Sequence, residues 1–189
     1  MQALVRTEEG GYSNLVLKSQ LARFGGTAQE RAFAAAVFYG TVERKNTLDY
    51  CLGKFLQKPL FRLDAPVRAI LRAGLYQAKY MQSVPVHAAV SESVALCRRM
   101  RKASAAGLVN AVLRRAAAVD VGKETFESET QRLCVQYSVS QPVAELLQRR
   151  LPTYAERLLA ASFEKPALAV RVTTLRTTPQ ALSAQLAAH

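Results

Sequence analysis

The stretch DAPVRAILRAGLYQ, residues 64–77, decides the fold class of this chain. Asp64 can cap a helix, and Pro66 stands in the first turn, where a missing N–H costs nothing. Small or apolar residues then recur three and four positions apart and form one continuous stripe: Val67, Ile70, Leu71, Gly74, Leu75 and Ala78. The segment therefore predicts a long helix that buries one face.

Helical spacing also dominates the residues before this stretch. Ser13 can cap a helix that runs to about Phe24 and ends at Gly25-Gly26. Thr27 and Glu30 form a capping-box pattern for the next helix, whose inward residues would be Phe33, Val37 and Phe38. Thr47 could cap a further helix that ends before Pro59 and buries Leu48, Cys51, Leu52, Phe55 and Leu56.

Two more helices follow the opening stretch. The first carries the stripe Val86, Ala89, Val90, Val94 and Cys97. The second opens at Ser104, and we expect it to bury Leu108, Ala111, Val112 and Val119, with the small residues Ala105, Ala106, Gly107 and Ala111 allowing close approach to its neighbours. Residues 1–119 are therefore predicted to form one all-α domain.

The composition changes at Asp120, where an acidic stretch with few large apolar residues begins. We interpret residues 120–134 as a linker and residues 135–189 as a short helical extension. The extension contains helices at 143–151 and 154–163, a second capping box at Thr153 and Glu156, one β-strand at 168–175 and a last helix from Thr178-Pro179. A lone strand cannot pair with itself, so we expect the chain to be part of a longer one.

Charge points to a polyanionic partner. The 189 residues carry 26 Lys and Arg against 14 Asp and Glu, a net charge of +12. Residues 61–119 alone carry ten basic side chains and two acidic ones, Asp64 and Glu92, which gives +8 in under a third of the chain. A solvated face normally intersperses acids with bases, so this excess is typical of a nucleic-acid footprint.

Reactive groups are few. The cysteines Cys51, Cys97 and Cys134 stand 46 and 37 residues apart, which fits neither a disulfide framework nor a zinc site, and the first two lie on apolar stripes as fillers. His87 is interpreted as a partly buried residue at a helix start, and His189 is terminal. We therefore predict no catalytic, cofactor-binding or metal-binding residue. No apolar run approaches the roughly 18 residues of a membrane span, which favours a cytoplasmic protein.

The basic residues of 61–119 are the candidate site. Arginine presents a planar fork of donors that matches phosphate oxygens. We predict RNA contacts through Arg98, Arg99, Arg101, Lys102, Arg114 and Arg115, with Arg68, Arg72 and Lys79 as second choices. Exposed aromatics in this stretch are few, so base stacking should be minor.

Four of these segments also resemble a known domain in register. Residues 31–41, 63–77, 84–94 and 106–115 are similar, in order, to the NusB-like RNA-binding domain found at the N-terminus of the bacterial 16S rRNA cytosine-C5 methyltransferase family (RsmB, Sun or Fmu). The resemblance implies a compact helical bundle that binds ribosomal RNA.

Residues 135–138, 164–166 and 170–176 resemble the linker helices and first strand of the N-terminal subdomain of that methyltransferase, although Val139-Ser140 and Thr173 depart from its pattern. The family carries its S-adenosylmethionine-binding sheet and two catalytic cysteines further on, and none of the three cysteines here matches them. The resemblance therefore implies the RNA-positioning end of an enzyme, without its cofactor site.

Two alternatives remain open. One is a NusB-type antitermination factor that binds leader RNA together with a small ribosomal protein, which leaves residues 120–189 unexplained. The other is a helical module for protein docking or dimerisation, in which the charge is incidental. The sequence does not indicate an oligomeric state.

Overall fold

The computed structural model describes residues 1–164 and 170–187, and within those ranges the regular structure is entirely helical. The elements are α1 (Gln2–Glu8), α2 (Ser13–Ala22), α3 (Ala28–Glu43), α4 (Lys45–Gly53), η1 (Leu60–Arg62), α5 (Ala65–Tyr80), α6 (Val86–Arg99), η2 (Ala103–Ala105), α7 (Ala106–Ala117), η3 (Val121–Lys123), α8 (Glu129–Gln136), α9 (Gln141–Arg150), α10 (Ala155–Ala161) and α11 (Pro179–Ala187).

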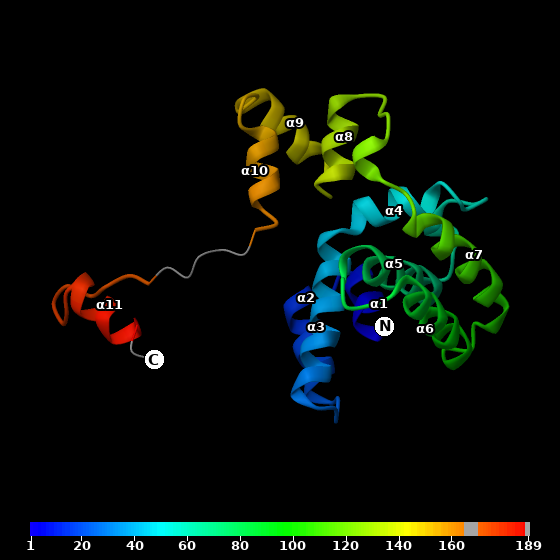
Figure 1. Cartoon of the computed structure of the whole chain (residues 1–189), viewed down its shortest axis with the longest axis horizontal. Coiled ribbons are helices and arrows are strands. Elements are labelled where there is room, and N and C mark those ends of the chain that lie inside the picture. Colours follow the sequence, from blue (N-terminus) through cyan, green and yellow to red (C-terminus); the bar gives the residue numbers. More distant parts are fainter. Residues whose placement is uncertain (165–169, 188–189) are drawn as a thin grey trace.

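Helix α5 is the centre of the bundle, as Figure 1 shows, and it packs against α1, α3, α4, α6 and α7. The predicted stripe is confirmed, because Val67, Ile70, Leu71 and Leu75 are all buried. Ala69 and Ala73 on another face are buried as well, against α1, α2 and α3. The helix is therefore enclosed on more than one side, as expected of a helix with few polar residues.

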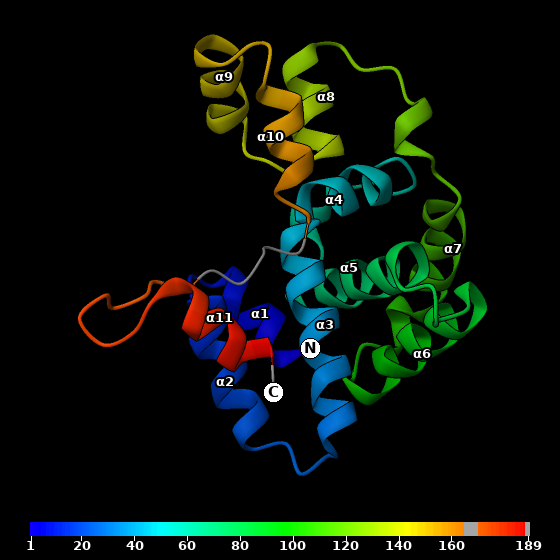
Figure 2. The ribbon, with the colours of Figure 1, turned by 60° about the vertical axis from the view of Figure 1, so that its left-hand side comes forward.

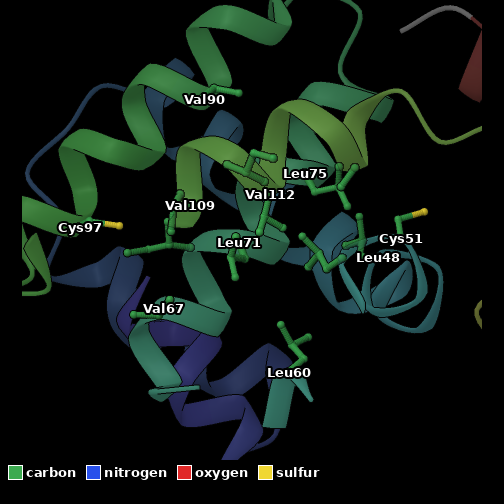
Figure 3. Packing of buried hydrophobic residues seen from close by; sticks show 14 residues of the cluster. Leu48, Cys51, Leu60, Val67, Leu71, Leu75, Val90, Cys97, Val109 and Val112 are labelled. Atoms are coloured by element: carbon green, nitrogen blue, oxygen red, sulfur yellow. The ribbon is translucent and has the colours of Figure 1, made fainter. Parts of the chain in front are cut away.

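The main core forms where α4, α6 and α7 converge on α5 (Figure 3). Leu48 and Cys51 come from α4, Val90 and Cys97 from α6, and Val109 and Val112 from α7. Both cysteines are fully buried, which confirms their interpretation as apolar fillers, and burial raises the pKa of each thiol.

Two glycines allow close helix packing. A Cβ on Gly74 of α5 would stand 2.3 Å from the Ser93 hydroxyl of α6, and a Cβ on Gly40 of α3 would overlap the ring of Tyr76 on α5. Of the small residues expected to serve this purpose near α7, Ala105 and Ala106 pack against the core, whereas Gly107 has open space around it and Ala111 is exposed. Close approach is thus concentrated at α5.

Some of the helix caps predicted from the sequence are formed and others are not. The Thr27 and Glu30 capping box is formed, with Glu30 N–H donating to the Thr27 hydroxyl at 3.2 Å and Thr27 N–H donating to the Glu30 carboxylate at 2.7 Å. Asp64 occupies the N-cap position of α5 but its side chain pairs with Lys102 instead. Ser13 is the first residue of α2, and its predicted role as the cap was wrong.

Thr47 lies inside α4 rather than at its start, because α3 leads into α4 through Arg44 alone. The free N–H of Asn46 in the first turn of α4 donates to the Ser138 hydroxyl at 2.9 Å, and the Thr47 hydroxyl donates to the Val135 carbonyl at 2.6 Å. The residues after α8 therefore provide the cap that sequence reasoning assigned to Thr47.

Two expectations about α6 and α7 were wrong. Val86 is 44 % exposed at the start of α6, and Leu108 and Ala111 point outward from α7. The residues that α7 buries are Val109, Val112, Leu113 and Ala116. Helical spacing allows either Leu108 or Val109 to face inward, and packing against α5 and α6 buries Val109.

The extension is joined to the bundle rather than held on a free linker. Helix α8 (Glu129–Gln136) begins within the predicted linker 120–134 and ends beyond it, and it lies beside α4 in both views (Figures 1 and 2). The predicted helices at 143–151 and 154–163 are confirmed as α9 and α10. A small core of Leu133, Ala144 and Leu159 holds α8, α9 and α10 together.

The second capping box is not formed. Tyr154 is the N-cap of α10, and the Glu156 carboxylate accepts hydrogen bonds from Arg132 and from the Tyr137 hydroxyl, each at 2.8 Å. Tertiary partners have therefore taken the carboxylate that the local motif required.

The predicted strand is not formed in the residues described. Residues 170–173 have no regular structure and 174–176 form a turn, while 168 and 169 lie outside the described ranges. No second strand exists in 1–164 or 170–187 for this segment to pair with, and an isolated strand is unstable in water. Helix α11 begins as predicted, with Ala181 N–H donating to the Thr178 hydroxyl at 3.2 Å.

Candidate nucleic-acid interface

Four basic residues cluster where α6 turns into α7: Arg98, Arg99, Arg101 and Lys102. A Schellman motif shapes the turn, because Lys102 N–H donates to the Cys97 carbonyl at 2.8 Å and Arg101 N–H donates to the Arg98 carbonyl at 3.1 Å. These four residues are called the turn cluster below. Two of its arginines also sit in the last turn of α6, where cations favour the helix dipole.

Arg101 adopts a backbone conformation that usually requires glycine. Its φ is 57°, the left-handed region, which costs a residue with a Cβ about 1–2 kcal/mol. This is the C′ position of the motif, where glycine is the common choice. Strain of this kind is retained most often at functional positions, which points to a role for the Arg101 side chain.

The turn cluster is weakly engaged by carboxylates. Arg99 lies 3.2 Å from Glu92 with both side chains about two-thirds exposed, and Lys102 lies 2.5 Å from Asp64. The Lys102 ammonium lowers the pKa of the Asp64 carboxyl. Exposed pairs of this type contribute about 0–1 kcal/mol. Within residues 1–164 and 170–187, Arg98 and Arg101 pair with no carboxylate, so the cluster can exchange its partners for phosphates.

Arg114 and Arg115 form a second basic group at the other end of α7, about 13 Å along the helix from its first residue. Arg114 donates to the Asn110 side chain at 3.1 Å, and the guanidinium of Arg115 lies 4.5 Å from the centre of the Phe55 ring. The six first-choice residues are therefore all exposed or half-exposed, but they form two groups joined by α7.

The second-choice residues serve the interior of the bundle. Arg72 is 8 % exposed and pairs with Glu8 of α1 and, at 2.5 Å, with Asp49 of α4. Arg68 donates to the same Glu8 carboxylate at 2.7 Å. Lys79 donates to the Val119 carbonyl. The three cations hold α1, α4 and the residues after α7 against α5, which leaves them less available to RNA than the six first-choice residues.

Sequence reasoning missed this role because the partners are remote in the chain. Glu8 precedes Arg68 by 60 residues, and Asp49 precedes Arg72 by 23. One signal was present: Arg68 and Arg72 are the two polar residues in an otherwise apolar or glycine run from Val67 to Leu75. A helix enclosed on several sides can hold such arginines only if carboxylates reach them.

The described residues offer no reactive centre. His87 is exposed in the first turn of α6, so its expected partial burial was wrong, and Cys134 is half-buried with a pKa raised by burial. In 1–164 and 170–187 no three His, Cys, Asp or Glu side chains gather as metal ligands. None of the described helices combines the length and hydropathy needed to cross a bilayer.

Comparison with known proteins gives a consistent result. The sequence profile described as the NusB family matches residues 1–118. The chain is 29 % identical over 178 residues to the probable ribosomal RNA small subunit methyltransferase B of Synechocystis sp., which covers 93 % of this chain and 40 % of that protein. It is 39 % identical over 114 residues to the ribosomal RNA small subunit methyltransferase B of Thermus thermophilus, covering 60 % of this chain and 28 % of that protein.

A transcription antitermination protein NusB of Rhodopseudomonas palustris is 36 % identical over 86 residues, which is 44 % of this chain and 49 % of that protein. Among solved structures, the crystal structure of PH0851 superposes with a TM-score of 0.68 at 14 % identity, covering 97 % of this chain and 42 % of that one. The structural match supports the fold. The chain spans two-fifths or less of the two methyltransferases described above.

Proposed function

The chain belongs to the NusB family, and on that basis we propose that it binds ribosomal RNA as the positioning portion of a small-subunit rRNA cytosine-C5 methyltransferase. The observation that carries the proposal is the set of six accessible cations around α7: Arg98, Arg99, Arg101, Lys102, Arg114 and Arg115. Arg101 keeps its side chain there at the expense of backbone strain.

The methyltransferase assignment is favoured over the antitermination factor by what lies beyond residue 118. The Synechocystis methyltransferase aligns with 93 % of this chain, whereas the Rhodopseudomonas NusB protein aligns with 44 %. Helix α8 and the residues after it are hydrogen-bonded to Asn46 and Thr47 of α4, so the start of the extension belongs to the same folded unit as the bundle. An antitermination factor has no evident use for this extension.

In this proposal the chain contributes binding and orientation. The methyl group would come from S-adenosylmethionine held elsewhere in a full-length enzyme, and the described residues supply no group for that chemistry. The basic groups at either end of α7 would each contact the RNA backbone and release counterions from it. Phosphate contacts fix register and orientation without reading sequence, which is the task of a positioning domain.

Fluorescence anisotropy with a 16S rRNA fragment tests the proposal. Six phosphate contacts to single-stranded RNA predict a slope of about −4 when log K is plotted against log salt. The variant R98E/R99E/R101E should lose most of the affinity. Its matched control is R149E/R150E/R157E, which removes the same charge from exposed arginines of α9 and α10. A slope near zero, or equal losses in the two variants, contradicts the proposal.

The docking alternative has one observation in its favour. An apolar groove of about 710 Å³ lies between α1, α2, α3 and α6, and Phe24 and Phe33 are each 45 % exposed beside it. If the module serves docking or dimerisation, the mass measured by size exclusion should exceed that of a monomer. That mass should also survive R98E/R99E/R101E, because apolar association does not depend on those charges.

A further inference from the structure

A second, smaller groove lies beside the Arg114 and Arg115 end of α7. It has a volume of about 310 Å³ and is bounded by α7 and the chain that follows α4. It is lined by apolar side chains that include Phe55, Leu63, Leu108 and Ala111, and by the cations Lys58 and Arg115. The described residues that line it include no carboxylate. An apolar groove whose charged lining residues are all basic suits an anionic ligand that has an apolar face.

The groove explains why α7 carries apolar residues on its outer side. Leu108, Ala111 and Arg115 are spaced three and four positions apart, so they form one line along the helix. Leu108 is 38 % exposed and Ala111 is exposed, although helical spacing predicts that both are buried. Departures from local sequence rules concentrate at functional sites, and this departure lies next to the basic surface.

Arg115 is held without a carboxylate. Its guanidinium stacks over the Phe55 ring at 4.5 Å from the ring centre, and no ion pair to it is formed in 1–164 or 170–187. Cation–π contact of this kind fixes the guanidinium plane while leaving its donors unused. Arginine planes and aromatic rings are the surfaces on which proteins stack unpaired RNA bases.

We propose that this groove receives one unpaired RNA base, which stacks at Arg115 against Leu108 and Ala111. The inference rests on the proposed RNA-binding function and adds to it the structure of the RNA that is recognised: a bulged or looped nucleotide flanked by backbone. The volume lies at the low end of the range of about 300–1,000 Å³ for small-ligand sites, which suits a single planar base.

A protein segment is a poorer occupant of the same groove. A specific protein interface buries roughly 1,200–2,000 Å² in total, far more than a groove of this size provides. The two cations that line the groove would also require an acidic protein partner, whereas a nucleotide brings its own phosphate to Lys58 and Arg115.

The experiment compares three RNAs by anisotropy: a duplex, the same duplex with one bulged adenosine, and the duplex with an abasic nucleotide at the bulge. The wild-type chain should bind the bulged RNA at least about fivefold more tightly than the abasic one, the lower end of what base stacking provides. The variant A111F fills the groove and should remove this preference while keeping the salt slope. The matched control A36F, at an exposed position of α3, should keep both.

A further variant, R115K, keeps the charge and loses the planar stacking surface. It should reduce the preference for the base and leave the salt slope unchanged. Equal binding of bulged and abasic RNA by the wild type, with a salt slope that stays steep, overturns the base site and leaves the proposed function standing. A preference that persists in A111F also overturns it. Absence of salt-dependent binding to all three RNAs overturns both proposals.

Discussion

Replacing Arg101 by glycine should raise the free energy of unfolding and lower the affinity for RNA. The wild-type residue has a φ of 57° at the C′ position of the motif that ends α6. Relief of that strain in Arg101→Gly gains about 1–2 kcal/mol, and the extra freedom of glycine in the unfolded chain returns about 0.5–1 kcal/mol. We therefore expect a net stabilisation of up to about 1.5 kcal/mol, at about 2–4 °C in Tm for each kcal/mol in a chain of this size.

The same change should weaken RNA binding. Loss of one phosphate contact reduces the magnitude of the salt slope by about 0.7 for a single strand. At a cost of about 1 kcal/mol the affinity falls about fivefold. Arg101→Ala loses the same charge but keeps a Cβ in the left-handed conformation, so it should match the glycine variant in RNA binding and fall below it in stability.

Urea denaturation and anisotropy, run on the same three proteins, measure both quantities. A glycine variant that is less stable than the wild type would refute the assignment of strain to Arg101. Two variants that bind RNA as tightly as the wild type would refute the assignment of its side chain to the interface.

Three further predictions follow from the packing. Gly74→Ala places a Cβ 2.3 Å from a serine hydroxyl and should lower the free energy of unfolding by about 1–3 kcal/mol, whereas Gly107→Ala, in open space, should raise it by about 0.5–1 kcal/mol; urea denaturation measures both. Thr47→Val leaves a buried carbonyl of α8 without its donor and should cost about 1–3 kcal/mol, with faster proteolysis between α7 and α8. Hydrogen bonds from Arg132 and Tyr137 lower the pKa of Glu156. The stability that this carboxylate contributes is therefore present above its unfolded pKa of about 4.5 and is lost as the pH falls through the lower folded pKa. Amide protection in α10 should fall first in that pH range, and Glu156→Gln should remove the effect.

The main helices could be predicted because their signals are local. The stripe from Val67 to Leu75 has one arrangement that buries it, and Thr27 with Glu30 satisfies its own N–H groups within one turn. Such features depend on residues four positions apart or fewer, which a sequence displays directly. The six first-choice cations could be predicted as accessible for the same reason, since helix ends and turns face water.

What could not be predicted depended on distant partners. Thr47 has the composition of a cap, yet its hydroxyl serves a carbonyl 88 residues later, and Ser138 caps the helix in its place. Helix α7 has two apolar faces, and its packing against α5 and α6 buries Val109 rather than Leu108. The exposed face that resulted is the one beside the small groove.

Charge counted along the chain also differs from charge on the surface. Residues 61–119 carry a net charge of +8 and residues 1–60 carry +3. Inside the bundle, however, Arg68 and Arg72 are neutralised by Glu8 and Asp49, which belong to residues 1–60. Without these four residues, the net charge is +6 for residues 61–119 and +5 for residues 1–60. The positive field that would draw RNA toward the molecule therefore arises from both segments, whereas the proposed close contacts lie at the two ends of α7. Because steering depends on the whole field and affinity on local contacts, reversing distant charges should slow association and reversing the turn cluster should also speed dissociation.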